Sequence, residues 1–560
     1  MKRTLPAAVA IVLSALSSAR ATDYFISPTG SDKNDGLDAS RPWQTFGKAE
    51  SRVVLAPGNR LILMDGDYSR PVNGLVNITC GENASNGTSS SHVTILSQHE
   101  RRAHLAGDGS ADTFHIKGCS FYDVIGIFAE SADNPNNGRN GQPFRFELGD
   151  HYSAIRNLAR HNNRYANAHL FSFEGRPASH THDNLFLENE CYDFFLKCVL
   201  FWYNDSPVAR RNYANSRPGS WTDLPGAVLN PPACPPLPCT PKKSGNALRG
   251  SELISCYPCS HGIYENNVSE NQDMGYTIDP AYSAGFGLGN RYYGNISIDD
   301  EIGFKAVSRG DGIGYMPQDT ELHDFVVAGN TSVGVWFRAN KNSSCDHCSV
   351  FNGGKGAQGY HADSYAKGQQ GDLAYSVRYT NSLATSLETR AAYGWFIEDR
   401  PSTGAMSWSI GYSLAFGNAT DFLPKLPNSN VDHSSVRDPG LGACRLWVPP
   451  GAAAKGAGTG GSDIGATILY RYENGTLTSN PLWDPQTGAF LGAGAIVPGI
   501  NDVAGSSLFD VHTRLNVNRN GCPFPPGYPS PQASEASPSG AKPARVDSLN
   551  SSRGAIPGTR

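Results

Sequence analysis

Two stretches 28 residues apart follow one template, and they constrain the fold more than any other feature of the chain. Residues 267–276 and 295–304 each begin with an Asn, continue with a polar run, and end with a Gly followed by an aromatic residue. A pattern that recurs every roughly 20–50 residues is typical of a solenoid, because one repeat cannot bury its own apolar face. We therefore predict an all-β chain wound as a long parallel β-helix.

An Asn recurs along most of the chain, usually after a short apolar run. The apolar runs argue against a chance recurrence of Asn. Inward-pointing Asn side chains at a bend can stack from one turn to the next and satisfy backbone groups. The Asn residues in question are Asn157, Asn189, Asn212, Asn267, Asn295, Asn330, Asn352 and Asn381. The widest gap contains a Pro-rich insertion at residues 217–243, so we predict outer loops of variable length.

The composition agrees with a turn-rich β protein. Charged residues make up only 17% of the chain, and there are 61 Gly. Gly supplies turns and destabilises helix interiors.

The N-terminus has the pattern of an export signal. Lys2 and Arg3 precede an apolar core at residues 7–16, and Ala19-Arg20-Ala21 is a cleavage pattern. An uncleaved anchor is the alternative, but the apolar run is short for a membrane span. We expect a secreted, periplasmic or cell-surface protein without stable membrane insertion. Cleavage after residue 21 removes three positive charges and no acids, which takes the formal charge from −5 to −8 and disfavours nucleic acid as a partner.

The even number of cysteines, twelve, predicts disulfides in an exported protein. Cys234 and Cys239 are predicted to close a loop in the Pro-rich insertion. The pairs Cys256/Cys259 and Cys345/Cys348 are either disulfides or a zinc site. A zinc ribbon is disfavoured because the two pairs lie 86 residues apart.

The first part of the mature chain contains four motifs in order: SPTGSDKNDG, PWQTFGKA, APGNRLILMDGDY and HVTILSQ. This series resembles the N-terminal cap and first turn of secreted right-handed β-helix proteins of the pectate lyase-like superfamily. The resemblance implies a right-handed parallel β-helix with an N-terminal helical cap, for which we expect a short helix at residues 46–53. It does not select an activity, because the superfamily includes lyases, glycoside hydrolases and binding proteins.

The sequence divides into four segments. We predict a signal peptide at 1–21, the β-helix at 22–424, an irregular C-terminal cap or extension at 425–522, and a disordered tail at 523–560. The Asn repeat stops in the third segment, and the fourth is rich in Pro, Ser and Gly. We expect the protein to be a monomer.

The polar side of the two template stretches is the predicted functional site. Side chains of adjacent turns meet there, because neighbouring strands lie about 4.8 Å apart. Asp273, Asp299 and Asp300 are candidate ligands for Ca²⁺, a cation that takes oxygen ligands. Lys305 and Arg309 project to the same side if their strand is straight. Such a groove suits an extended polysaccharide.

A second resemblance concerns the run IGFKAVSRG, which is similar to the element that carries the base in family 9 polysaccharide lyases. It implies that Lys305 removes the C5 proton of a uronate polymer in a β-elimination. Because Arg309 would project beside Lys305, we predict it to be the partner of the substrate carboxylate. That family also has an acidic calcium-binding run. At the corresponding point this chain has Gln272, Asp273, Met274, Gly275 and Tyr276, so two of the expected carboxylates are missing.

The remaining candidates and alternatives are less specific. Arg338, His361 and Tyr276 are predicted to bind substrate. A glycoside hydrolase on the same scaffold needs two carboxylates, for which Asp299/Asp300 or Glu398/Asp399 are the candidates. A non-catalytic carbohydrate-binding protein is the third possibility. In that case Lys305 is a solvated surface residue and the acids are ordinary turn caps.

Overall fold

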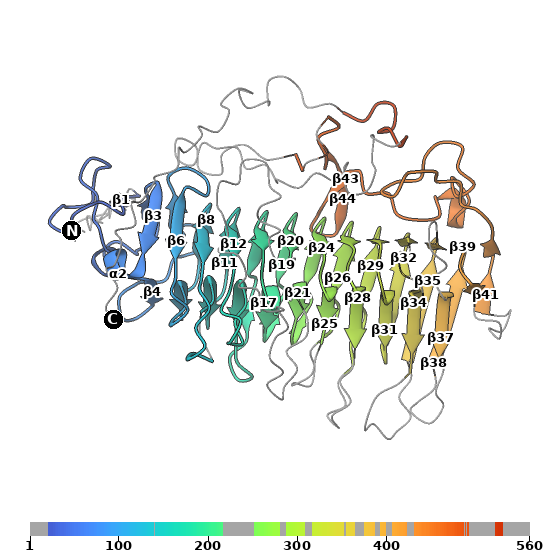
Figure 1. Cartoon of the computed structure of the whole chain (residues 1–560), viewed down its shortest axis with the longest axis horizontal. Helices are drawn as coiled ribbons and strands as arrows, with labels where there is room; N and C mark the ends of the chain where they lie inside the picture. Colours follow the sequence, from blue (N-terminus) through green and yellow to red (C-terminus); the bar gives the residue numbers. More distant parts are fainter. Residues whose placement is uncertain are drawn as a thin grey trace, which may run out of the picture.

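The structure is a computed structural model. It describes residues 21–138, 141–216, 251–279, 287–307, 316–351, 354, 356–364, 375–386, 393–398, 406–422, 430–486, 488, 490–491 and 521–529. Within these ranges the chain winds in successive coils through three long parallel sheets (Figure 1). We call the sheets A, B and C, in the order in which each coil passes through them. The predicted right-handed parallel β-helix is confirmed.

Three sheets hold most of the strands. Sheet A comprises β1 Asp23–Ile26, β2 Arg60–Leu63, β5 Val93–Ser97, β8 Tyr122–Ile125, β11 Tyr152–Ile155, β15 Leu185–Leu187, β19 Val208–Arg210, β23 Ile263–Glu265, β26 Arg291–Tyr293, β29 Glu321–His323, β32 Ser343–Asp346, β35 Tyr375–Thr380, β38 Met406–Gly411 and β41 Val431–Asp432. Sheet B comprises β3 Gly66–Ser69, β6 Ala103–Ala106, β9 Phe128–Glu130, β12 Leu158–Arg160, β16 Glu190–Tyr192, β20 Tyr213–Asn215, β24 Val268–Glu270, β27 Ile296–Ile298, β30 Val326–Ala328, β33 Ser349–Phe351, β36 Leu383–Thr385, β39 Leu414–Phe416 and β42 Ser435–Val436. Sheet C comprises β4 Val76–Thr79, β7 Phe114–Lys117, β10 Phe144–Glu147, β13 Phe171–Glu174, β17 Lys197–Trp202, β21 Glu252–Cys256, β25 Met274–Ile278, β28 Ile302–Val307, β31 Val333–Arg338, β34 Gln358–Asp363, β37 Tyr393–Glu398 and β40 Thr420–Phe422.

A few further elements lie outside these sheets. They are the small parallel sheet β14 Thr181–His182, β18 Asn204–Asp205 and β22 Cys259–Ser260, the hairpin β43 Tyr470–Glu473 and β44 Thr476–Pro481, the helices α1 Phe46–Ala49 and α2 Arg70–Asn73, and the 3-10 turn Thr459–Gly461. The first strand of the helix begins at Asp23, and the last stacked strand ends at Val436, beyond the predicted boundary at residue 424.

The two template stretches occupy adjacent coils. Met274 pairs with Ile302 and Tyr276 with Phe304, so Gly275 and Gly303 lie side by side on β25 and β28. A Cβ on Gly303 would lie 2.6 Å from the carbonyl oxygen of Gly334 on the next strand, which explains why the position is Gly. The recurrence in the sequence therefore reflects stacking in space.

The corner between sheets A and B explains the recurring Asn. Each of five successive coils places an Asn immediately before its sheet B strand, where the side chain is fully buried. The Asn267 amide donates to the carbonyl oxygen of Ala209 at 2.9 Å and to Oδ1 of Asn295 at 2.9 Å. Side-chain amides and backbone N–H groups both donate to Oδ1 of the next Asn along the series Asn157, Asn189, Asn212, Asn267 and Asn295.

The ladder does not include every Asn of the predicted series. Asn381 lies one residue before the ladder position, which Ser382 takes in that coil. Asn330 lies in the corner between sheets B and C, and Asn352 falls outside the described residues.

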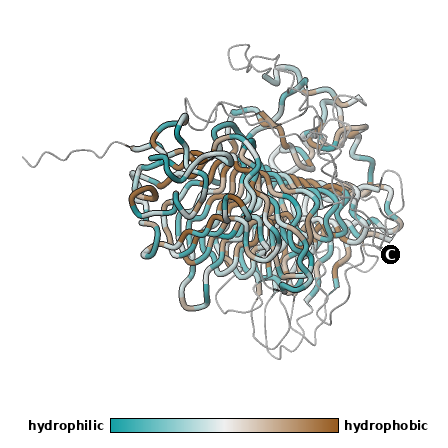
Figure 2. The backbone as a smooth tube through the Cα atoms, turned by 60° about the vertical axis from the view of Figure 1, so that its left-hand side comes forward, coloured by the Kyte–Doolittle hydropathy of each residue, from teal (hydrophilic) through white to brown (hydrophobic). Residues whose placement is uncertain are grey.

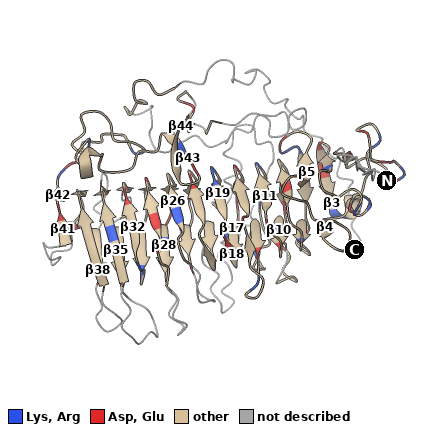
Figure 3. Ribbon diagram, turned by 180° about the vertical axis from the view of Figure 1, so that it is seen from behind, with Lys and Arg blue, Asp and Glu red and all other residues tan. Residues whose placement is uncertain are grey.

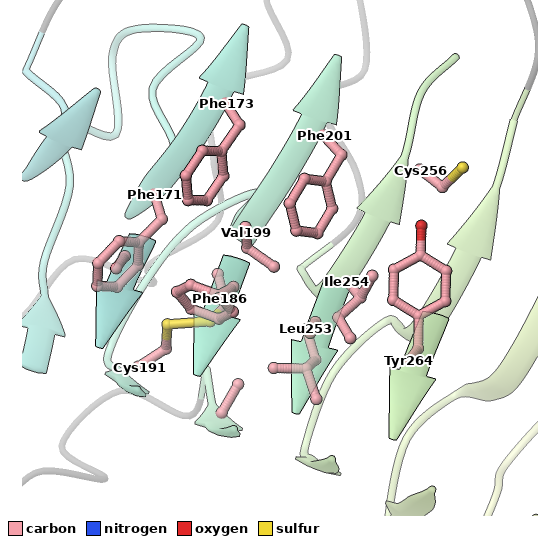
Figure 4. Close-up of a cluster of buried hydrophobic side chains, with 14 of the residues drawn as sticks. Phe171, Phe173, Phe186, Cys191, Val199, Phe201, Leu253, Ile254, Cys256 and Tyr264 are labelled. Atoms are coloured by element: carbon pink, nitrogen blue, oxygen red, sulfur yellow. A yellow bond between two sulfur atoms is a disulfide. The ribbon is translucent and has the colours of Figure 1, made fainter. Parts of the chain in front are cut away.

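Aromatic side chains fill the interior as stacks along the axis of the helix. Phe146 stacks on Phe173 at 4.8 Å between ring centroids, and Phe173 stacks on Phe201 at 5.3 Å. Figure 4 shows Phe173 and Phe201 on neighbouring strands beside Cys191, Phe186 and Tyr264. Figure 2 shows hydrophobic positions recurring along the stacked coils.

The N-terminal end is closed differently from the prediction. The predicted helix at residues 46–53 is only the four-residue α1, capped by the Thr45 hydroxyl, and a helical cap is not confirmed. The first coil is instead closed by aromatic packing, because Trp43 stacks on Tyr24 at 5.7 Å and Phe46 packs on Tyr68 at 5.5 Å.

Five disulfides join cysteines in the described part of the chain. The pairs are Cys80–Cys119, Cys191–Cys198, Cys256–Cys259, Cys345–Cys348 and Cys444–Cys522. Both Cys-x-x-Cys pairs are thus closed on themselves, as the disulfide alternative predicted. Cys234 and Cys239 lie outside the described residues.

The chain after β42 returns along the outside of sheet B. This C-terminal segment, residues 437–486, 488, 490–491 and 521–529, lies above the coils in Figure 1, where β43 and β44 stand over the middle of the helix. Its apolar side chains cover a strip of outward-facing residues on sheet B. The covered strip consists of Phe128, Leu158, Tyr192, Tyr213, Val268, Ile296, Ile298, Val326, Phe351, Leu383 and Leu414. Most of the predicted tail, residues 530–560, and nearly all of the predicted signal peptide fall outside the described residues.

Charged residues are spread thinly over the strands (Figure 3). A search of the described helices finds none that is long and apolar enough to cross a membrane.

Candidate functional site on the outer face of sheet C

Lys305 belongs to a row of outward-pointing side chains that crosses sheet C. It is half-buried, whereas its neighbours on β28, Phe304 and Ala306, point into the core. The register places Lys305 beside Thr277 on one side and Trp336 on the other. The alternation of side chains along a strand therefore confirms that Lys305 lies on the outer wall.

The row continues across two more strands. Trp336 on β31 pairs with His361 on β34, and His361 pairs with Phe396 on β37. The rings of Trp336 and His361 are stacked, with 5.2 Å between centroids and 4° between planes. A continuous ledge of one cation and three rings results.

Two cations contact the Trp336 ring. The Lys305 Nζ lies 5.0 Å from the ring centroid, and the Arg338 guanidinium carbon lies 5.8 Å from it. Both distances are within the range of cation–π attraction. The ring thus brings two positive groups from adjacent strands to one place on the wall.

Asp363 organises the same group of side chains. Its carboxylate accepts a hydrogen bond from the Trp336 indole nitrogen at 2.8 Å. The Arg338 Nε lies 3.8 Å from Asp363 Oδ1, and the His361 Nε2 lies 3.4 Å from Oδ2. The Asp363 side chain is only 5% exposed. It is therefore held by protein groups and not by solvent.

A second carboxylate stands next to Asp363. Glu398, at the end of β37, is its register partner on the neighbouring strand. The wall therefore carries two acids, two cations and a row of rings within four consecutive coils, which can bind a polar polymer that carries charge. We call Lys305, Trp336, Arg338, His361, Asp363 and Glu398 the sheet C cluster.

The structure brings together four of the residues predicted from the sequence: Lys305, Arg338, His361 and Glu398. Tyr276 is not with them. Its ring is fully buried in the interior, and its hydroxyl lies within hydrogen-bond distance of two carbonyl oxygens, those of Asn267 at 2.7 Å and Ile296 at 2.9 Å. Arg309 and Asp399 lie outside the described residues.

The three predicted calcium ligands do not form a common site. Asp300 is fully buried, and its carboxyl accepts hydrogen bonds from the Gln272 backbone at 2.7 Å and the Ser297 hydroxyl at 2.6 Å. Burial raises the pKa of Asp300 to about 8. Asp273 is exposed. Two clusters of His and Asp in the described part of the chain could hold an ion, and neither contains Asp273, Asp299 or Asp300. These residues do not fit a calcium centre, so no chemistry is derived through one.

Sequence reasoning missed a second charged group, nearer the N-terminus on the same sheet. Arg145 contacts Glu174 at 2.8 Å and Asp112 at 3.3 Å, and His115 contacts Glu147 at 3.2 Å. The hydrogen bond from His115 holds the pKa of Glu147 at about 2, with Arg145 and Arg176 as further causes. The repeated pattern Phe-x-Phe-Glu, ending at Glu147 and Glu174, could have revealed that these acids are neighbours.

The comparisons with known proteins bear on the fold. No family model and no curated protein matches the chain. Among solved structures, a pectate lyase aligns over 80% of this chain and 96% of its own, with 12% identity and a TM-score of 0.37. The A-module of a mannuronan C-5 epimerase from Azotobacter vinelandii aligns over 68% and 91%, with 13% identity and a TM-score of 0.42. An alginate lyase of family PL6 aligns over 81% and 60%, with 11% identity and a TM-score of 0.44.

The parallel β-helix is defined by the stacked sheets themselves. Identities and TM-scores this low carry no argument about the activity of this chain.

Proposed function

We propose that the protein is an exported polysaccharide lyase, and that the sheet C cluster binds and cleaves a uronate-containing polymer. The observation that carries the proposal is the convergence of Lys305 and Arg338 on one aromatic ring of the outer wall. A Lys and an Arg held close together offer a proton acceptor and a carboxylate partner within the reach of one sugar unit.

The binding step follows from the charges. A guanidinium pairs with a carboxylate through two parallel hydrogen bonds, so Arg338 is the group to hold the uronate carboxylate. The partly exposed ledge of Trp336, His361 and Phe396 offers apolar surface to the faces of the sugar rings. Asp363 holds Trp336 in place and keeps Arg338 beside it.

The chemical step is a β-elimination. Pairing with Arg338 withdraws charge from the substrate carboxylate and makes the C5 proton more acidic. Neutral Lys305 takes that proton and becomes an ammonium, the C4–O bond breaks, and a C4–C5 double bond forms. The departing oxygen takes a proton from water. The products are one chain with an unsaturated end and one with a new reducing end.

The test is release of the unsaturated, ultraviolet-absorbing product from pectate, alginate and glycosaminoglycans. General-base catalysis contributes roughly 100- to 10,000-fold. We therefore expect Lys305→Ala to lower the rate on the accepted polymer by at least about 100-fold. Lys117→Ala is the matched control, because Lys117 is an exposed lysine on β7 of the same sheet. Full activity of Lys305→Ala would remove the proposed role of Lys305. The same digests with and without a chelator test the calcium prediction.

A glycoside hydrolase is the second candidate, and the register pair Asp363 and Glu398 favours it. Glycosidases use two carboxylates that flank the scissile bond. The products separate the two candidates, because hydrolysis yields new reducing ends without the unsaturated chromophore. In that case Glu398→Gln should abolish cleavage while Lys305→Ala retains it. Retention of a polymer without turnover would favour the third possibility, a carbohydrate-binding protein.

Export is part of the proposal. Five disulfides in the described residues are consistent with an oxidising compartment. A polysaccharide partner outside the cytoplasm agrees with this location. The monomeric state stays a prediction, which the molar mass in solution would test.

A further inference from the structure

A group of histidines and aspartates lies at the corner between sheets A and B, separate from the outer face of sheet C. His323 ends β29 and Asp346 ends β32, and the two are register partners on neighbouring strands. Asp324 and His347 follow them, and both have left-handed backbone, with φ values of 49° and 52°. The pair His323-Asp324 of one coil therefore lies next to the pair Asp346-His347 of the following coil.

Three ligand atoms of this group converge. The His347 Nδ1 lies 3.2 Å from Asp346 Oδ2, and the His323 Nε2 lies 3.6 Å from the same oxygen. One ligand atom from each of the three residues lies within 4.8 Å of the other two. Ligands about 2.0–2.2 Å from a tetrahedral Zn²⁺ are roughly 3.3 Å apart. The spacing thus fits one transition-metal ion bound by two imidazoles and a carboxylate.

The groups behind the ligands are arranged to aim them. The His323 Nδ1 lies 3.2 Å from Asp324 Oδ2 and 3.1 Å from the Tyr472 hydroxyl, which leaves Nε2 to face the other two ligand atoms. Asp346 uses its other oxygen, Oδ1, to accept from Thr380 at 2.8 Å and Asn381 at 2.9 Å. Support of this kind orients imidazole and carboxylate ligands at metal centres.

The third ligand has a buried nitrogen aimed at the same point. The His347 Nδ1 is shielded from solvent, and its contact with Asp346 does not have hydrogen-bond geometry. A buried imidazole nitrogen that makes no hydrogen bond is costly, and a metal ion would satisfy it.

We propose that His323, Asp346 and His347 form a binding site for a divalent transition-metal ion such as Zn²⁺. With three protein ligands, a fourth position stays open for water. Tyr472 belongs to the C-terminal segment and also donates to Asp324 Oδ2 at 2.6 Å, so the site connects that segment to the corner of the helix. Bound metal is expected to strengthen the attachment of the segment.

The other His-Asp group that could hold an ion in the described residues is less suitable. It consists of His151, His182 and Asp183, and both nitrogens of His182 already contact carboxylates, Asp150 at 3.2 Å and Asp183 at 3.0 Å. The side chains of His182 and Asp183 are about half exposed, at 49% and 55%. Both His182 nitrogens are therefore already engaged and two of the three ligands are exposed, so this group serves as an internal comparison.

The test is a titration of the untagged, full-length chain with Co²⁺, followed by its visible absorption, and with Zn²⁺, followed by calorimetry. We expect one strongly bound ion per chain. His347→Ala and Asp346→Asn should each weaken binding at least about 100-fold, since each removes a ligand. Asp346→Asn retains an oxygen for Thr380 and Asn381, so its fold should be preserved.

Two controls make the result specific. His433→Ala changes the histidine at the equivalent corner of the last coil, which is exposed and paired with Asp432, and it should bind as the wild type does. His151→Ala should also bind normally. Zn²⁺ should raise the unfolding temperature of the wild type but not of Asp346→Asn, because only a folded site gains from binding. No saturable binding, or equal binding by wild type, His347→Ala and Asp346→Asn, would overturn the proposal.

Discussion

At the scale of single residues, burial decides what an ionisable group can do. Asp300 is a buried carboxyl held by neutral hydrogen-bond donors, and desolvation raises its pKa to about 8. The sequence shows only an Asp-Asp-Glu run, which is compatible with a cation site, a turn cap or a buried acid. These three possibilities differ in the atoms that surround the carboxyl. In the structure the surrounding atoms come from two different coils.

Asp300 makes a pH-dependent contribution to stability. The carboxyl of the unfolded chain ionises near the ordinary aspartate pKa of 3.8, whereas the folded one keeps its proton to about pH 8. The folded state then binds more protons than the unfolded state, so stability falls as pH rises between these values and levels off above about pH 8. Asp300→Asn should remove this slope and raise the urea midpoint at neutral pH. Asn330 already occupies the equivalent position in the next coil.

The measurement is the urea unfolding midpoint from about pH 4 to pH 9. Asp273→Asn, an exposed acid in the preceding coil, is the control and should keep the wild-type slope. An unchanged slope in Asp300→Asn would mean that Asp300 is ionised in the folded protein.

At the scale of elements, the Asn ladder shows how a corner is stabilised. Each ladder Asn satisfies a backbone carbonyl of the coil before it, and all but the last, Asn295, also bond to the Asn of the next coil, as Asn267 does. The Asn amide offers both a donor pair and an acceptor on a short side chain. The predicted series was confirmed for five coils and wrong for Asn330 and Asn381, because recurrence in sequence cannot separate different corners or adjacent corner residues.

Loss of one rung should destabilise the coil stack. Asn267→Ala leaves buried partners on Asn212, Asn295 and Ala209 without their hydrogen bonds, and each unsatisfied group costs about 1–3 kcal/mol. We expect a clear drop in the urea midpoint and faster amide exchange in the flanking coils. Asn480→Ala, on the exposed part of β44, should change stability by less than about 0.5 kcal/mol. Equal stability of the two variants would contradict the ladder's role.

At the scale of the whole molecule, the C-terminal segment completes the fold by covering sheet B. It is attached at many points along several coils. The Thr459 and Tyr472 backbone nitrogens donate to Asn381 and Asn266, and Cys522 is joined to Cys444 within the segment. Without it the apolar strip of sheet B would face water, which marks an aggregation site in a monomer.

Glu473 is the charged contact of this attachment. It lies 3.0 Å from Arg211 and 3.5 Å from Arg210, and the Arg211 side chain is only 7% exposed. Hydrogen bonds to charged groups contribute about 1.5–3 kcal/mol. We expect Glu473→Gln to speed limited proteolysis within residues 437–470 several-fold while leaving the coils resistant. Glu82→Gln, at an exposed acid, should not change the cleavage rate. Equal protection in both variants would show that the apolar cover alone holds the segment.

The sequence by itself determined that the chain is a solenoid, because stacking forces chemically similar residues to recur at each coil. It also favoured disulfides over a zinc site for the cysteines and placed Lys305 on the polar side of its turn. Only the tertiary structure decided which coils lie in contact, and therefore that Lys305, Arg338, His361 and Asp363 meet on one wall while Asp300 is buried away from it. The physical reason is that such neighbours are joined across strands of different coils, and loops of variable length remove any fixed spacing between them.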